Sequence, residues 1–306
     1  MRFFLSRAAA AVLTILLAIT LAVVLSDAGG DPVRNLLGPQ ATRADVAKER
    51  ATLGLNRPLS SQIVSEIGDV AQGNFGTSLQ YDRSNLQLIE SRLPYSAELM
   101  GAALLLAILL GVPLGVLAAV RENSWIDRVS MTGALFGQSV PLYWLGMLTV
   151  LVFAVDLRWF PAGYAGGVSH LILPAVVLAT FSLGAIARLT RSSMTQVLDE
   201  PYIMAARAHG LREGRVVFRH ALRTAALPVV TMIGLQAGAL ISGVVTIEIV
   251  FAWPGLGSLA VSAVSFRDFP LVQAIVIFGA IVFVAINFTV DVLYGLLDPR
   301  VRHSRA

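Results

Sequence analysis

Six long apolar runs take up most of this chain, and they limit its fold more than any other feature of the sequence. The first run is nearly as long as the roughly 20 residues that a helix needs to cross a membrane, and the other five reach that length. The runs cover residues 8–25, 95–120, 129–155, 168–187, 225–250 and 269–297. We therefore predict an all-α membrane protein with six transmembrane helices.

The composition agrees with this class. The 306 residues are 56% hydrophobic and only 14% charged, whereas a soluble domain carries about 25% charged residues. The absence of cysteine excludes disulfides and thiolate chemistry. The histidines at 170, 209, 220 and 303 lack the spacing of zinc ligands, so we predict no metal site and no catalytic residues. The basic residues lie beside apolar runs, which favours anionic lipid and a partner protein over nucleic acid.

Three parts of the chain differ in character. Residues 1–25 have a short basic lead and an uncharged run longer than the core of a usual signal peptide, so we predict a retained transmembrane anchor over a cleaved signal. Residues 26–94 are polar and of mixed charge, with regular apolar positions, which predicts a small extracytoplasmic domain between helices 1 and 2. Residues 95–306 contain the remaining apolar runs and form the predicted transmembrane domain.

Arginines are concentrated on one side of the predicted membrane. Seven of them lie between Arg188 and Arg223, and Arg121 and Arg128 fall on the same side. The short loops of the opposite side contain only Arg158 and Arg267. Because basic residues are enriched in cytoplasmic loops, we expect both termini and the loop 188–228 in the cytoplasm.

A charged island within that loop, residues 199–228, has its own pattern of helix starts and stops. Asp199 as a cap, Pro201 in the first turn and Gly210 as a stop predict one short helix, small enough to enter a groove of another protein. A second helix with a stripe of arginines follows, and Pro228 marks the next apolar run. A plain basic connector is the alternative interpretation. The residues predicted to contact a partner are Tyr202, Ala205, Ala206, Arg207, His209, Gly210 and Leu211.

Prolines interrupt three of the predicted spans, at positions 113, 141 and 174. Such breaks fit backbone that lines a water-filled cavity, and close helix packing through small residues explains them equally well. If a cavity exists, the polar residues most suited to line it are Gln138 and Ser139, beside Pro141, and Gln236.

Several motifs occur in order along the chain. They are Gly30-Asp31-Pro32, Leu53-Gly54-Leu55, Gly73-Asn74-Phe75-Gly76, Ala205-Ala206 with Gly210, Arg219 to Arg223, Leu227-Pro228, Glu248 to Phe251, Trp253 to Gly257, Arg267 to Pro270 and Leu297 to Arg300. Together they resemble the permease subunits of ATP-binding-cassette (ABC) importers, in the dipeptide, oligopeptide and nickel family, and most nearly its first permease chain. Met204 stands where members commonly have a glutamate.

The resemblance implies a six-helix permease bundle in the plasma membrane of a prokaryote. It implies that the loop 188–228 holds the coupling helix, which docks on an ATPase subunit. It also implies a second, related permease chain, two ATPase domains on one or two chains, and an extracytoplasmic substrate-binding protein. This sequence has no Gly-rich phosphate loop ending in Lys-Ser/Thr. ATP and magnesium are therefore expected on the partner ATPases, with no cofactor and no enzymatic activity in this chain.

Three other functions are alternatives to the import of dipeptides or oligopeptides. Nickel or another peptide-like cargo of the same family stays open. An ion-coupled secondary transporter usually places ionisable residues near the middle of the bilayer, and the apolar runs here lack such carboxylates. An intramembrane enzyme would need a catalytic constellation, and no Ser/His, paired-Asp or His-Glu set occurs within the runs.

Overall fold

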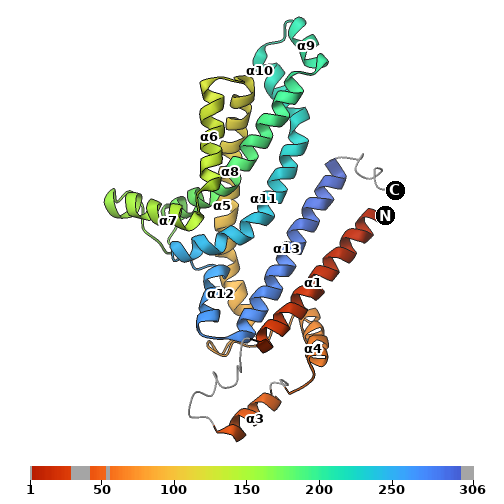
Figure 1. The fold of residues 1–306 in the computed structure, drawn as a ribbon, viewed down its shortest axis with the longest axis vertical. Helices are drawn as coiled ribbons and strands as arrows, with labels where there is room; N and C mark the ends of the chain where they lie inside the picture. Colours follow the sequence, from red (N-terminus) through yellow and green to blue (C-terminus); the bar gives the residue numbers. More distant parts are fainter. Residues whose placement is uncertain (1, 29–41, 53–55, 298–306) are drawn as a thin grey trace. The chain divides into compact units, whose positions relative to one another are not determined.

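The structure is a computed structural model that describes residues 2–28, 42–52 and 56–297. Nearly all of these residues are helical, as Figure 1 shows, and the described part contains no strand beyond an isolated bridge between Thr77 and Ser84. The predicted all-α fold is confirmed. The helices are α1 (Arg2–Ala28), α3 (Arg43–Thr52), α4 (Leu59–Ala71), α5 (Asn85–Val120), α6 (Trp125–Ser139), α7 (Leu142–Thr149), η1 (Val150–Asp156), α8 (Val168–Leu198), α9 (Pro201–Ala208), α10 (Glu213–Arg215), η2 (Val216–Ala221), α11 (Leu222–Val250), α12 (Leu256–Ser265) and α13 (Phe269–Leu297).

The chain divides into two compact units. Unit 1 comprises Met1–Pro94 and Gly255–Phe288, and unit 2 comprises Tyr95–Pro254 and Thr289–Ala306. Unit 1 thus includes residues 255–288, which belong to the predicted transmembrane domain 95–306. The placement of residues 26–94 outside the membrane stays a prediction. Three motifs, at residues 30–32, 53–55 and 297–300, fall wholly or partly outside the described residues.

Five described helices are long and apolar enough to cross a membrane. They correspond to the predicted spans at 8–25, 95–120, 168–187, 225–250 and 269–297. The remaining predicted span, 129–155, is a bent pair in which α6 and the α7–η1 segment meet at 101°. The described residues therefore contain five spans, or six if the bent pair counts as one.

Pro141 explains the bend. Proline has no N–H to continue the helical ladder and disfavours helical geometry in the residue before it. Val140 accordingly has an extended backbone, with φ −78° and ψ 131°. The prediction that prolines 113 and 174 also interrupt their spans is wrong, because each lies inside a continuous helix, α5 and α8 respectively. In general, a proline is tolerated inside a membrane helix where neighbouring groups satisfy the backbone that it frees.

Three helices continue beyond the apolar runs. α5 begins at Asn85 and α8 ends at Leu198, well past the predicted ends. The helix that contains α11 starts at Glu213, so the second predicted helix of the charged island is continuous with the next span. Pro228 lies inside α11 and marks no boundary. A π-helical segment, η2, separates α10 from α11.

The core of unit 2 is formed by α5, α8 and α11. Its fully buried side chains include Leu99 of α5, Leu178 of α8 and Leu240 of α11. Small residues bring these helices together: a Cβ on Gly115 would lie 2.5 Å from the carbonyl oxygen of Ala187. Close packing, the second of our two interpretations, is therefore the reason for a glycine at this position.

Trp253 closes one end of this core. Only 1% of its surface is exposed. Its indole Nε1 donates to the carbonyl oxygen of Tyr95 at 2.9 Å, and the two rings meet edge to face. An indole buried in protein needs such an acceptor.

In unit 1, Asp268 ties the turn before α13 to the segment before α5. Its buried carboxylate accepts hydrogen bonds from the hydroxyl of Ser78 at 2.5 Å and from the backbone N–H groups of Leu79, Gln80 and Leu271.

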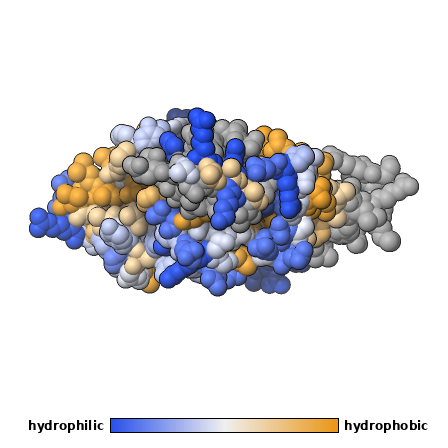
Figure 2. Space-filling view, turned by 90° about the horizontal axis from the view of Figure 1, so that it is seen from below, coloured by the Kyte–Doolittle hydropathy of each residue, from blue (hydrophilic) through white to orange (hydrophobic). Residues whose placement is uncertain are grey.

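Figure 2 shows hydrophobic and strongly hydrophilic residues side by side on the surface. Exposed leucines such as Leu17 of α1 and Leu109 of α5 are what a lipid-facing helix presents.

Candidate functional site

The short helix α9 contains most of the residues predicted to contact a partner, and Figure 1 shows it beyond the end of α8. Pro201 occupies its first turn, as predicted, where the missing N–H has no intrahelical partner in any case. The residue that precedes the helix is Glu200 and not Asp199, and it makes no side-chain cap. Asp199 instead ends α8. The helix stops where Gly210 adopts φ +78°, which confirms the predicted turn.

One buried side chain anchors α9. Ile203 is completely buried among Met194 and Leu198 of α8, Val216 and Val217 of η2, and neighbouring apolar residues. Ile203 is not among the residues predicted from the sequence, since a single apolar residue in so short a helix gives no periodicity.

Two polar contacts brace the same helix. The Tyr202 hydroxyl donates to Oγ1 of Thr224 at 3.0 Å, and Arg207 holds Glu213 with donor–acceptor distances of 2.7 and 3.2 Å. The carboxylate of Glu213 raises the pKa of Arg207, which stays charged. α9 is therefore fixed to α8 and to the start of the α11 helix.

The predicted contact residues separate into two groups. Tyr202, Ala205, His209 and Gly210 are exposed and available to a partner, whereas Arg207 is exposed but paired with Glu213. Ala206 and Leu211 are half-buried and pack against the cluster around Ile203. Met204, which we had not included, is 55% exposed and adds apolar area to the free face.

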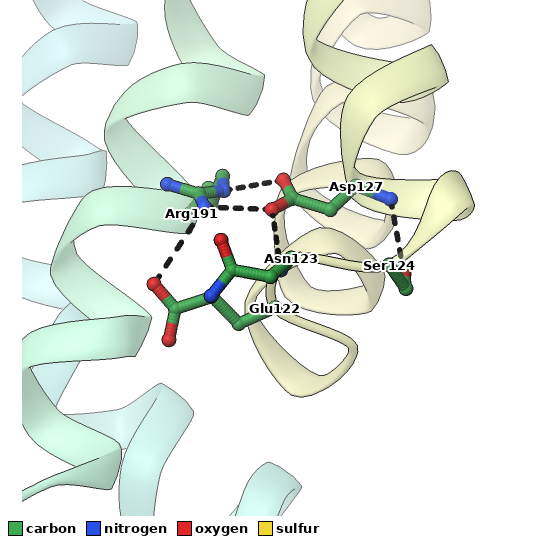
Figure 3. A network of polar contacts seen from close by, with 5 residues as sticks. All are labelled: Glu122, Asn123, Ser124, Asp127 and Arg191. Carbon is green, nitrogen blue, oxygen red and sulfur yellow. Dashed lines mark hydrogen bonds and ion pairs between the residues drawn. The ribbon is translucent and has the colours of Figure 1, made fainter.

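A charged network stands at the α5–α6 turn (Figure 3). Arg191 of α8 donates to both carboxylate oxygens of Asp127, at 2.5 and 2.7 Å, and lies 3.7 Å from Glu122. The Asp127 N–H donates to the Ser124 hydroxyl, and Asp127 accepts from the backbone N–H of Asn123. A bidentate arginine–carboxylate pair is both strong and directional. The Ser124-x-x-Asp127 spacing is a helix-start signal in the sequence, and it could have predicted the start of α6.

The predicted pathway residues do not form one group. Gln138 is half-buried, and its Oε1 accepts from Nη2 of Arg188 at 2.6 Å. Ser139 is exposed, with its hydroxyl bonded to the carbonyl oxygen of Leu135. Gln236 is buried on α11, and no hydrogen bond among the described residues joins it to Gln138 or Ser139. The described residues contain no cluster of three or more His, Cys, Asp or Glu that would hold a metal ion.

The chain is similar in sequence to one protein family and to individual proteins within it. Residues 111–303 match the family described as binding-protein-dependent transport system inner membrane component. The glutathione transport system permease protein GsiC of Salmonella typhi is 44% identical over 275 residues, covering 90% of each chain. The di/tripeptide transport system permease protein DppB of Pseudomonas aeruginosa is 39% identical over 305 residues, covering 90% of this chain and 91% of its own.

Solved structures share the fold at lower identity. An inward-facing conformation of the MetNI methionine ABC transporter superposes with a TM-score of 0.59 at 18% identity. The match covers 69% of this chain and 97% of that chain. At this identity the likeness concerns the helical architecture alone.

Proposed function

Because the chain belongs to the family of binding-protein-dependent transport system inner membrane components, we propose that it imports a peptide-like cargo and takes its driving force through α9. It is the permease subunit of an ABC importer and a multi-pass inner membrane protein. The names of its relatives, a glutathione permease and a di/tripeptide permease, support a cargo with peptide chemistry.

The proposed assembly follows from what one such chain lacks. The five or six spans of the described residues are few for a complete pathway, so a second, homologous permease chain would supply the other half. Two ATPase domains, on one or two chains, would bind ATP and magnesium. A substrate-binding protein would deliver cargo on the extracytoplasmic side, and both termini of this chain would lie in the cytoplasm.

The coupling role is supported by two features of α9: one face is exposed, and one side chain on the other side is buried and anchors the helix. Tyr202, Met204, Ala205 and His209 are exposed, whereas Ile203 is fully buried in the cluster that joins α8 to η2. A force applied to the exposed face is therefore passed to two of the long helices rather than absorbed by a loose loop. ATP-driven closure of the ATPase domains would then rock the bundle between its outward and inward openings.

The test is a charge on the free face. Ala205→Glu suits it better than the same change at Ala206, because Ala206 packs against the chain's own apolar cluster. We expect Ala205→Glu to lower both the yield of co-purified ATPase and cargo-stimulated ATP hydrolysis, with the permease still inserted. Gln196→Glu adds the same charge at an exposed position of α8, outside α9, and serves as the control. Equal coupling in the two variants would refute the role of α9.

A further inference from the structure

Arg188 is a half-buried arginine whose only hydrogen-bonding partner among the described residues is a neutral amide. Its Nη2 donates to Oε1 of Gln138 at 2.6 Å, and no described carboxylate lies within ion-pair distance. The next arginine of the same helix, Arg191, is held by two carboxylates. Arg188 thus has a positive charge without a matching negative one.

The register of α6 against α8 shows which way Arg188 points. Asp127 faces Arg191, the carbonyl of Ala134 faces Gly184, and Gly137 lies beside Thr180, so the two helices run antiparallel. In this register Gln138 lies opposite the part of α8 around Thr180. Thr180 is about 12 Å from Arg188 along the axis of α8. The guanidinium therefore extends away from the charged α5–α6 turn and toward the bend at Val140-Pro141.

This direction is opposite to the usual behaviour of arginine in membrane helices. A long basic side chain near the end of a span normally extends toward the nearer aqueous interface. Here the charged α5–α6 turn and Arg191 mark that end of α8, and the head of Arg188 extends the other way. A charge carried toward the apolar part of a span is costly unless a ligand or partner compensates it.

The groups that meet at this point are suited to bind an anion. A guanidinium offers planar, paired N–H donors that match the two oxygens of a carboxylate. The Gln138 oxygen is already occupied by Arg188, so the amide has its own N–H groups to offer. Both side chains lie where the backbone of the bent pair breaks, and broken backbone at membrane depth occurs where it is buried in protein or lines water.

We propose that Arg188 and Gln138 form a carboxylate-recognition site, which takes the C-terminal carboxylate of the cargo during its passage. This inference rests on the proposed import of a peptide-like cargo, since every unblocked peptide carries that group. The site would let the permease itself favour cargo with a free carboxylate, in addition to any selection by a binding protein.

The chain has no cysteine of its own, which permits a direct test. Ser139 is exposed and adjacent to Gln138, so Ser139→Cys reports occupancy through its rate of reaction with a maleimide. The assay uses the full importer complex in phosphatidylcholine nanodiscs, without binding protein, and follows the mass of this chain. Trialanine should slow the labelling. Trialanine amide should need about a tenfold higher concentration for the same effect, as expected for loss of a charge-assisted hydrogen bond.

Two substitutions then identify the groups responsible. Arg188→Gln should remove the difference between acid and amide. Gln138→Glu is the second variant, should the first fail to fold: it places an internal carboxylate beside Arg188 and should exclude the external one. Arg128→Gln is the control, because it removes an exposed arginine from the same helix pair and should leave the difference unchanged.

Other outcomes overturn the inference. Equal protection by acid and amide in the unsubstituted background would show that no carboxylate is recognised. Protection by phosphatidylglycerol alone, with no further effect of trialanine, would assign the site to a lipid phosphate. A complex that fails to assemble with ATPases, or whose ATP hydrolysis ignores cargo-loaded binding protein, would refute the proposed function and this inference with it. In an assembled, responsive complex, a negative labelling result refutes the site alone.

Discussion

At the scale of single residues, Gly210 sets the direction in which the chain leaves α9. Its φ of +78° is a conformation that residues with a Cβ rarely adopt, although a Cβ there would meet nothing within 4 Å. Gly210→Ala therefore introduces backbone strain without a clash. We expect a loss of about 1 kcal/mol in the stability of this turn and a measurable fall in cargo-stimulated ATP hydrolysis.

Gly214 provides the matched control for this prediction. It is also exposed, with open space around it, but its φ is not positive. Gly214→Ala should leave ATP hydrolysis unchanged and should not lower the melting temperature, because alanine favours a helix more than glycine does. Equal effects at the two positions would show that the conformation of Gly210 is unimportant.

Asp127 is the second residue with a definite expected cost. Only 4% of its surface is exposed, and its carboxylate accepts two bonds from Arg191. Asp127→Asn leaves the guanidinium with Glu122, at 3.7 Å, as its remaining carboxylate. We expect a destabilisation of roughly 2 kcal/mol, typical of losing hydrogen bonds to a charged group, visible as a lower melting temperature of the purified complex.

Arg207 supplies the comparison for Asp127. Its ion pair with Glu213 is exposed on both sides, and surface pairs contribute about 0–1 kcal/mol. Arg207→Gln should therefore change the melting temperature far less than Asp127→Asn. If both substitutions have the same small effect, the network in Figure 3 is not a structural clamp.

At the scale of helices, α9 depends on one anchor. Ile203→Ala removes the only side chain of α9 that is fully buried in the cluster with α8 and η2. We expect α9 to exchange its backbone amides faster with deuterium and to lose coupling, because cavity-forming truncations of isoleucine cost roughly 2–5 kcal/mol. Met204→Ala truncates an exposed neighbour and should weaken ATPase binding without faster exchange. Fast exchange in both variants would argue against Ile203 as the anchor.

The helices themselves were largely predictable, because long apolar runs have few other ways to satisfy their backbone in lipid. The ends were not. α8 and the α11 helix continue into charged sequence because their extensions pack with α9 on protein, in the cluster around Ile203. The effect of each proline was hard to predict for a related reason. Pro141 breaks its span and Pro174 lies in a continuous helix, and this difference depends on how each helix packs against its neighbours.

The candidate sites were predictable in part. Pro201 and Gly210 bounded α9 correctly through local backbone chemistry. The contacts of Arg191 with Asp127 and of Arg188 with Gln138 join residues 64 and 50 positions apart. Such pairings arise from helix packing, and no local pattern in the sequence announces them.

At the scale of the whole molecule, the orientation in the membrane is the last prediction. Arginines crowd the segment 188–228, and charged loops of this kind stay in the cytoplasm. Because the chain is free of cysteine, single cysteines can be placed at Ser61 of α4 and at Gly214, both exposed. In intact cells an impermeant thiol reagent should label Ser61→Cys at once and Gly214→Cys only after permeabilisation. Labelling of Gly214→Cys in intact cells, with Ser61→Cys silent, would invert the topology and place α9 out of reach of any cytoplasmic ATPase.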